Sequence, residues 1–177
     1  TGMTGAQALK PGVLKGEILL NLDSETEGEI YVGCAGGLDA SIKGKYERKP
    51  EPKGWLCYSL AVKGFQGGHS GMDIILCRAN ANKVGARVMY ALLTKADVKL
   101  IDMEGGTLRN AIPRECFATV YVDPAKLDVA KKVVADVFAE VKAEYAATDP
   151  GCNYVFEPYQ CAPGETCDPD ECLYVEE

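Results

Sequence analysis

The spacing of hydrophobic residues divides the middle of the chain into six elements. Leu56, Tyr58, Leu60 and Val62 alternate with smaller or polar residues, a period of two that predicts a strand. Further along, hydrophobic residues recur about every four positions, which is typical of an amphipathic helix. The predicted elements are a strand at 55–63, a helix at 78–95, strands at 98–103 and 116–122, a helix starting at 123–124, and a strand at 154–156.

The order strand, helix, strand, strand, helix, strand predicts an α+β fold. Ordinary connection rules turn this order into a four-stranded antiparallel sheet with both helices on one face, the ferredoxin-like arrangement. Asp123-Pro124 supports the start of the second helix, because an acid is a good N-cap and proline suits the first helical position. We expect this unit to span about residues 54–158, after a proline-rich loop or hairpin tip at 48–54.

The first 37 residues predict two more short strands, Gly16–Asp23 and Ile30–Ala35. The first is apolar and closes on an acid, and the second stops at Gly36-Gly37. Two such strands cannot form a stable sheet alone. We therefore expect the chain to be a fragment of a longer protein.

Composition narrows the class of protein. The 177 residues suit one domain, or one domain with a piece of another. The net charge is −7 and the basic residues are scattered, which argues against a nucleic-acid partner and against an anionic membrane surface. No apolar stretch approaches the roughly 18 residues that span a bilayer, and no secretory signal opens the chain. We expect a soluble, cytoplasmic protein.

The chain has eight cysteines. Five are dispersed through apolar segments, where a free cysteine behaves as a small hydrophobic residue. Cys161, Cys167 and Cys172 crowd into a proline-rich tail, at spacings that match no standard zinc pattern. Reduced thiols in a cytosolic protein are the simpler interpretation, and the tail at 159–177 has no assigned role.

Three positions are candidates for chemistry, and each has a plainer alternative. Asp23 ends a buried strand and offers oxygen ligands to a divalent metal, or simply caps the strand exit. His69, the only histidine, lies in a glycine-walled loop that can offer an imidazole outside the domain, or is part of a tight turn. Asn110 offers a donor and an acceptor in a long hairpin loop, where asparagine is common anyway.

The order and spacing of these motifs carry a resemblance. Leu20–Glu25, Gly67–Gly71 and Gly105–Pro113, together with Cys34–Gly37 and Arg78–Lys83, closely resemble the aminoacyl-histidine dipeptidases. These enzymes belong to the co-catalytic zinc metallopeptidases. The resemblance covers about residues 1–158.

The resemblance implies a two-domain subunit with a zinc-bearing α/β catalytic domain and an inserted lid domain that mediates homodimer formation. Residues 1–37 would end the first catalytic segment, and residues 38–158 would form the lid. Asp23 matches a ligand to one of two zinc ions, although other divalent metals could serve. His69 matches the lid histidine that steadies the transition-state oxyanion, and Asn110 matches an asparagine that holds the dipeptide substrate.

One histidine cannot complete the family's metal site. The resemblance implies a pair of glutamates directly before Thr1 and further zinc ligands elsewhere in the complete enzyme. We therefore expect this fragment of a dipeptidase for Xaa-His substrates to be inactive alone. The alternative is a non-enzymatic ferredoxin-like module that binds a small ligand or mediates dimers.

Overall fold

The computed structural model describes residues 4–20, 26–33, 36–159 and 173–176. The chain divides into two units, Thr1–Lys43 and Gly44–Glu177, each of which is described by itself. Asp23 and the three tail cysteines Cys161, Cys167 and Cys172 lie outside the described residues. Within the described part of the chain, no helix is long and apolar enough to cross a membrane.

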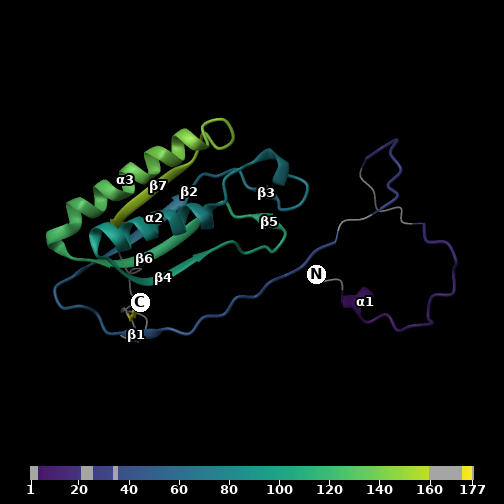
Figure 1. Ribbon diagram of the computed structural model, residues 1–177, viewed down its shortest axis with the longest axis horizontal. Coiled ribbons are helices and arrows are strands. Elements are labelled where there is room, and N and C mark those ends of the chain that lie inside the picture. The colour runs from purple at the N-terminus through teal and green to yellow at the C-terminus, as the bar shows by residue number, and fades with distance from the viewer. Residues whose placement is uncertain (1–3, 21–25, 34–35, 160–172, 177) are drawn as a thin grey trace, which may run out of the picture. The chain divides into compact units, whose positions relative to one another are not determined.

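A four-stranded antiparallel sheet forms the larger unit, with two helices on one face (Figure 1). Its elements are β2 (Leu56–Lys63), α2 (Ala81–Ala96), β4 (Lys99–Gly105), β6 (Cys116–Val122), α3 (Leu127–Glu144) and β7 (Asn153–Pro158). The strands lie in the order β4-β6-β2-β7. This order and the helix placement confirm the predicted α+β, ferredoxin-like fold.

Local sequence fixes where the two helices begin. The Asn80 side chain accepts hydrogen bonds from the backbone N–H groups of Asn82 and Lys83, at 3.0 and 3.2 Å, and so caps α2. Asp123 accepts one from Ala125 N–H at 2.9 Å. The turn that Asp123 caps is a short 3-10 helix, η2 (Pro124–Lys126), which leads into α3.

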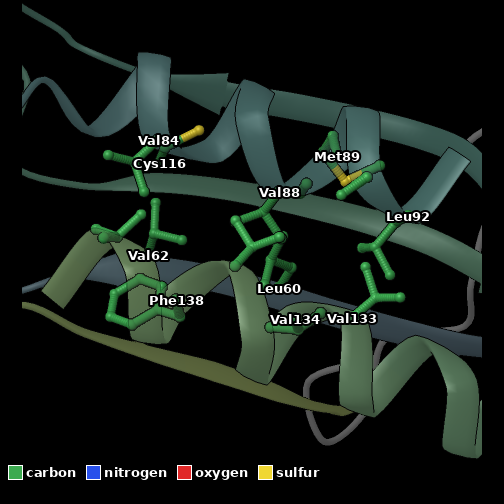
Figure 2. Close-up of a cluster of buried hydrophobic side chains, with 14 of the residues drawn as sticks. Leu60, Val62, Val84, Val88, Met89, Leu92, Cys116, Val133, Val134 and Phe138 are labelled. Carbon is green, nitrogen blue, oxygen red and sulfur yellow. The ribbon is translucent and has the colours of Figure 1, made fainter. Parts of the chain in front are cut away.

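The hydrophobic core lies between the sheet and the helices (Figure 2). Alternate residues of the central strands face it, including Leu60 and Val62 of β2. The helices supply Val88 of α2 and Phe138 of α3, which are 0% and 1% exposed. Burial of each such side chain contributes roughly 1.5–3 kcal/mol, so this layer stabilises the frame that carries the loops.

The two strands predicted for the N-terminal unit are wrong for the residues that can be checked. Residues 16–20 and 30–33 form no strand, and Leu19 and Val32 are 87% and 99% exposed. Among the described residues of this unit, α1 (Thr4–Gln7) forms a single helical turn. Strand-like hydrophobic patterns need neighbouring strands, and the described part of this unit supplies none.

Two short strand pairs were not predicted. β1 (Glu47–Lys49) pairs with β8 (Tyr174–Glu176), so the start of the predicted loop at 48–54 is an edge strand. The second pair joins β3 (Gly68–His69) to β5 (Ala111–Ile112). This second pair brings together the two loops that the sequence singled out.

Candidate functional site

The His69 loop and the Asn110 loop are joined through their backbones. In the β3–β5 pair His69 lies opposite Ala111. Next to it, Ser70 N–H donates a hydrogen bond to the carbonyl oxygen of Asn110, at 2.9 Å. Both His69 and Asn110 are exposed. Two motifs that are 41 positions apart in the sequence thus form one surface site at the end of the sheet.

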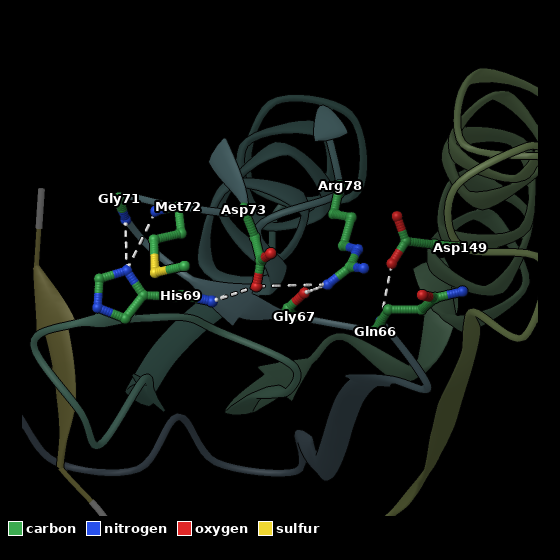
Figure 3. A network of polar contacts seen from close by, with 8 residues as sticks. All are labelled: Gln66, Gly67, His69, Gly71, Met72, Asp73, Arg78 and Asp149. Atoms are coloured by element: carbon green, nitrogen blue, oxygen red, sulfur yellow. Dashed lines mark hydrogen bonds and ion pairs between the residues drawn. The ribbon is translucent and has the colours of Figure 1, made fainter. Parts of the chain in front are cut away.

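The imidazole of His69 is held by its own loop. Its Nδ1 atom accepts hydrogen bonds from the backbone N–H groups of Gly71 and Met72, at 3.0 and 3.2 Å (Figure 3). An acceptor nitrogen carries no proton, so the neutral ring places its proton on Nε2. Figure 3 shows Nε2 pointing away from the two N–H groups. The loop therefore presents an exposed N–H donor.

Asp73 and Arg78 fix the backbone around His69. Asp73 accepts a hydrogen bond from His69 N–H at 2.8 Å, and Asp73 N–H donates to the His69 carbonyl at 3.0 Å. Arg78 Nη1 donates to the carbonyl oxygen of Gly67 at 2.7 Å and lies 3.8 Å from the Asp73 carboxylate. The backbone on both sides of the histidine is consequently tied to these two charged side chains.

Two glycines in this loop have a steric reason to be glycine. Gly67 and Gly68 have φ angles of 63° and 142°, which other residues rarely adopt. A Cβ atom on Gly68 would lie 2.5 Å from an Asp73 carboxylate oxygen and 2.8 Å from Arg78 Nη1. A side chain at Gly68 would therefore displace the two groups that hold the His69 backbone, and a Cβ atom on Gly67 would lie 2.8 Å from the carbonyl oxygen of Ile112.

The Asn110 hairpin is attached to the start of α2. The Asn82 side chain donates a hydrogen bond from Nδ2 to the carbonyl oxygen of Gly105, at 3.0 Å. Gly106 follows with a φ of 75° and lies against Pro113. The roles of Asn82 and Arg78 were missed from the sequence, because their partners Gly105 and Gly67 are 23 and 11 positions away. The role of Asp73 was missed as well, although His69 lies only four positions before it.

A metal site does not form within the described part of the chain. Among these residues there is no group of three or more histidine, cysteine, aspartate or glutamate side chains that could hold an ion. Asp23, the predicted ligand, lies outside the described residues. The described donor set alone therefore does not fit the expected zinc ions.

Buried and exposed thiols in the described segments should differ in reactivity. Burial raises the pKa of Cys116, and the nearby carboxylate of Glu104 adds to the effect. Burial likewise raises the pKa of Cys152, whereas Cys77 is exposed. Because the thiolate is the reactive form, we expect iodoacetamide at pH 8 to modify Cys77 well before Cys116 and Cys152. Peptide mass spectrometry after timed quenching measures this order, and equal rates in the folded chain would contradict the packing.

The comparisons decide the family. Residues 60–149 match the peptidase dimerisation domain of the M20 type. The chain belongs to this family. The matched residues run from β2 to Asp149 and so include both the His69 and the Asn110 loops.

Two relatives support the M20 assignment. The chain is 46% identical over 145 residues to the cytosol non-specific dipeptidase of Escherichia coli strain K12. These residues cover 82% of this chain and 30% of that protein. The crystal structure of the aminoacylhistidine dipeptidase from Vibrio alginolyticus matches with a TM-score of 0.77 and 36% identity, over 99% of this chain and 34% of that one. The chain thus spans about a third of each relative. The resemblance to aminoacyl-histidine dipeptidases is confirmed.

Proposed function

We propose that this M20 dimerisation domain is the lid portion of a metal-dependent dipeptidase and that His69 is its catalytic contribution. The observation that carries the proposal is the held imidazole: Nδ1 is occupied by Gly71 and Met72, and Nε2 is left as an exposed donor. An N–H that is fixed before the reaction can stabilise an oxyanion without reorganising. Asp73 and Arg78 hold the backbone that carries this ring, which keeps the donor in one place.

Asn110 is the proposed substrate-binding residue. Its backbone is tied to Ser70, directly after His69. An amide side chain can both donate to and accept from a peptide group. Because the two loops are joined, a substrate that meets the imidazole would also lie within reach of the Asn110 hairpin.

The metal belongs to the complete enzyme in this proposal. We propose zinc, with two ions and with Asp23 as one ligand, and the remaining ligands in segments outside this chain. Bound zinc would activate water and polarise the scissile carbonyl. The described residues contribute instead a hydrogen-bond donor and the frame that fixes it.

The names of the two relatives suggest the biological setting. One is a cytosolic non-specific dipeptidase and the other an aminoacylhistidine dipeptidase. We propose that the complete protein hydrolyses dipeptides, including Xaa-His dipeptides, in the cytoplasm. The match to a dimerisation domain favours a homodimer that forms through this lid.

The experiment compares the full-length protein with the 177-residue chain, both with zinc supplied, on a set of Xaa-His and other dipeptides. The proposal expects hydrolysis by the full-length protein and none by the chain. Release of free amino acids is followed by chromatography. Absence of hydrolysis by the zinc-loaded full-length protein on every dipeptide would favour the non-enzymatic module instead.

A further inference from the structure

Asp149 is a fully buried acid that the mechanism above does not use. It lies in the turn after α3 and is 0% exposed. Its Oδ1 accepts a hydrogen bond from Gln66 N–H at 2.8 Å, and its Oδ2 accepts one from Ala79 N–H at 2.9 Å. Gln66 and Ala79 bracket the loop that carries His69. One carboxylate therefore holds both ends of this loop.

The turn that carries Asp149 is itself firmly attached. Asp149 N–H donates to the Tyr145 carbonyl at 2.8 Å, and Cys152 N–H donates to the Asp149 carbonyl at 3.0 Å. The carboxylate is shielded from water, since Asp149 and its bonding partner Ala79 are both 0% exposed. A carboxylate in such a place is costly unless its oxygens are hydrogen-bonded. Bonds to a charged acceptor are about twice as strong as neutral ones, so the contact is a strong clamp.

A continuous series of contacts leads from this clamp to the imidazole (Figure 3). Gln66 precedes Gly67, whose carbonyl accepts from Arg78, and Arg78 precedes Ala79. Arg78 pairs with Asp73, whose carboxylate accepts from His69 N–H. A shift of either loop end would therefore move the groups that fix the His69 backbone and, through Gly71 and Met72, its ring.

We propose that Asp149 is a positioning residue that orients His69 by fixing both ends of its loop. The structural part of this inference stands on this chain alone, and its catalytic consequence rests on the proposed function. The turn after helix α3 would then help to orient the His69 ring, although it contacts only the two ends of the loop. Nothing in the spacing of the sequence connects position 149 with position 69.

The test uses the only histidine of the chain as its probe. In the 177-residue chain labelled with 15N, one imidazole gives one pair of ring-nitrogen signals. We expect Asp149→Ala to keep the circular dichroism spectrum of the folded domain. Its His69 Nδ1 signal should move toward the position of a ring that exchanges freely between tautomers. In the full-length protein the same variant should lower kcat about 10- to 100-fold, as misplacement of a catalytic group does, with KM and metal content little changed.

Val141→Ala is the matched control, since Val141 is also 0% exposed and lies on α3 but faces the core. It should lower stability without moving the His69 signal. A folded Asp149→Ala chain with an unchanged His69 signal would overturn the inference. If Asp149→Ala does not fold, Asp149→Asn, which keeps the size and one acceptor oxygen, decides by the same signal. Failure of both variants to fold would also overturn it, because the acid would then serve the whole domain.

The two proposals fail separately. A His69 signal that moves in Asp149→Ala, combined with a full-length wild-type protein that hydrolyses no dipeptide, would refute the dipeptidase and leave the clamp intact. An active wild-type enzyme in which Asp149→Ala leaves the His69 signal unchanged would refute the clamp and leave the dipeptidase proposal intact.

Discussion

His69→Ala in the full-length protein is expected to lower the turnover of dipeptides by about 100- to 1,000-fold, the usual effect of removing one oxyanion donor. The physical reason is that the variant removes the exposed Nε2–H while the loop's backbone contacts to Asp73 and Asn110 remain. Metal content should stay near that of the wild type, because His69 is proposed as a donor and not as a ligand. Steady-state kinetics and metal analysis of the same preparation measure both quantities.

Ser70→Ala is the matched control for this variant. It changes the neighbouring exposed residue and keeps the backbone hydrogen bond from Ser70 N–H to Asn110. Its turnover should remain within about threefold of the wild type, since it removes no group placed in the site. Loss of metal from His69→Ala would show that the imidazole is a ligand. An equal loss of turnover in both variants would show that any substitution in this loop disturbs the site, and that the imidazole has no specific role.

Phe138→Ala is expected to cost about 3–5 kcal/mol of unfolding free energy, as for other large-to-small changes in a packed core. Phe138 is 1% exposed, and its ring centroid lies 4.9 Å from that of Tyr154. The deletion leaves a cavity between α3 and the sheet that rigid neighbours cannot fill. Such a loss is a large part of the roughly 5–15 kcal/mol that stabilises a typical domain. Denaturant unfolding followed by circular dichroism measures it.

Phe117→Ala tests the same chemical change on the other face of the sheet. Phe117 lies on β6 and is 41% exposed, whereas its neighbours Cys116 and Ala118 face the core. We expect its cost to stay below about 2 kcal/mol, because 41% of this residue remains in water and its removal encloses no cavity in the core. Similar costs for the two variants would mean that the core does not lie between the sheet and the helices.

The fold of the larger unit was predictable because its signals are local. Strand β6 occupies Cys116–Val122 as predicted from alternation, and Asp123 caps the next turn as its position before Pro124 suggests. Helix α2 begins three residues after the predicted Arg78, since Asn80 caps it. Each of these features depends on side chains within a few positions of one another.

Several of the features that sequence reasoning missed depend on distant partners, although the contact of Asp73 with His69 N–H spans only four positions. The β3–β5 pair, the β1–β8 pair and the Asp149 clamp join residues between 42 and 129 positions apart. Asp149 in particular lies in the turn after α3, and no nearby residue indicates its contacts with Gln66 N–H and Ala79 N–H. The strands expected in residues 1–37 are wrong at the described positions 16–20 and 30–33 for the opposite reason. Their apolar pattern is local, but the described residues of this unit form no sheet with which they could pair.

The candidate site was found in part. The sequence singled out His69 and Asn110, and the structure joins their loops through the bond between Ser70 and Asn110. Their catalytic and substrate-binding roles stay predictions, as does metal binding by Asp23. The tautomer of His69 could not be predicted, because it depends on how the loop turns back so that Gly71 and Met72 face Nδ1.

The most direct measurement is a long-range 15N–1H correlation spectrum of the wild-type chain at a pH where its single imidazole is neutral. The account predicts the Nε2–H tautomer, with Nδ1 unprotonated and accepting from the loop. A ring protonated on Nδ1, or one that exchanges evenly between the two forms, would contradict it, because His69 would then present no fixed donor to a substrate.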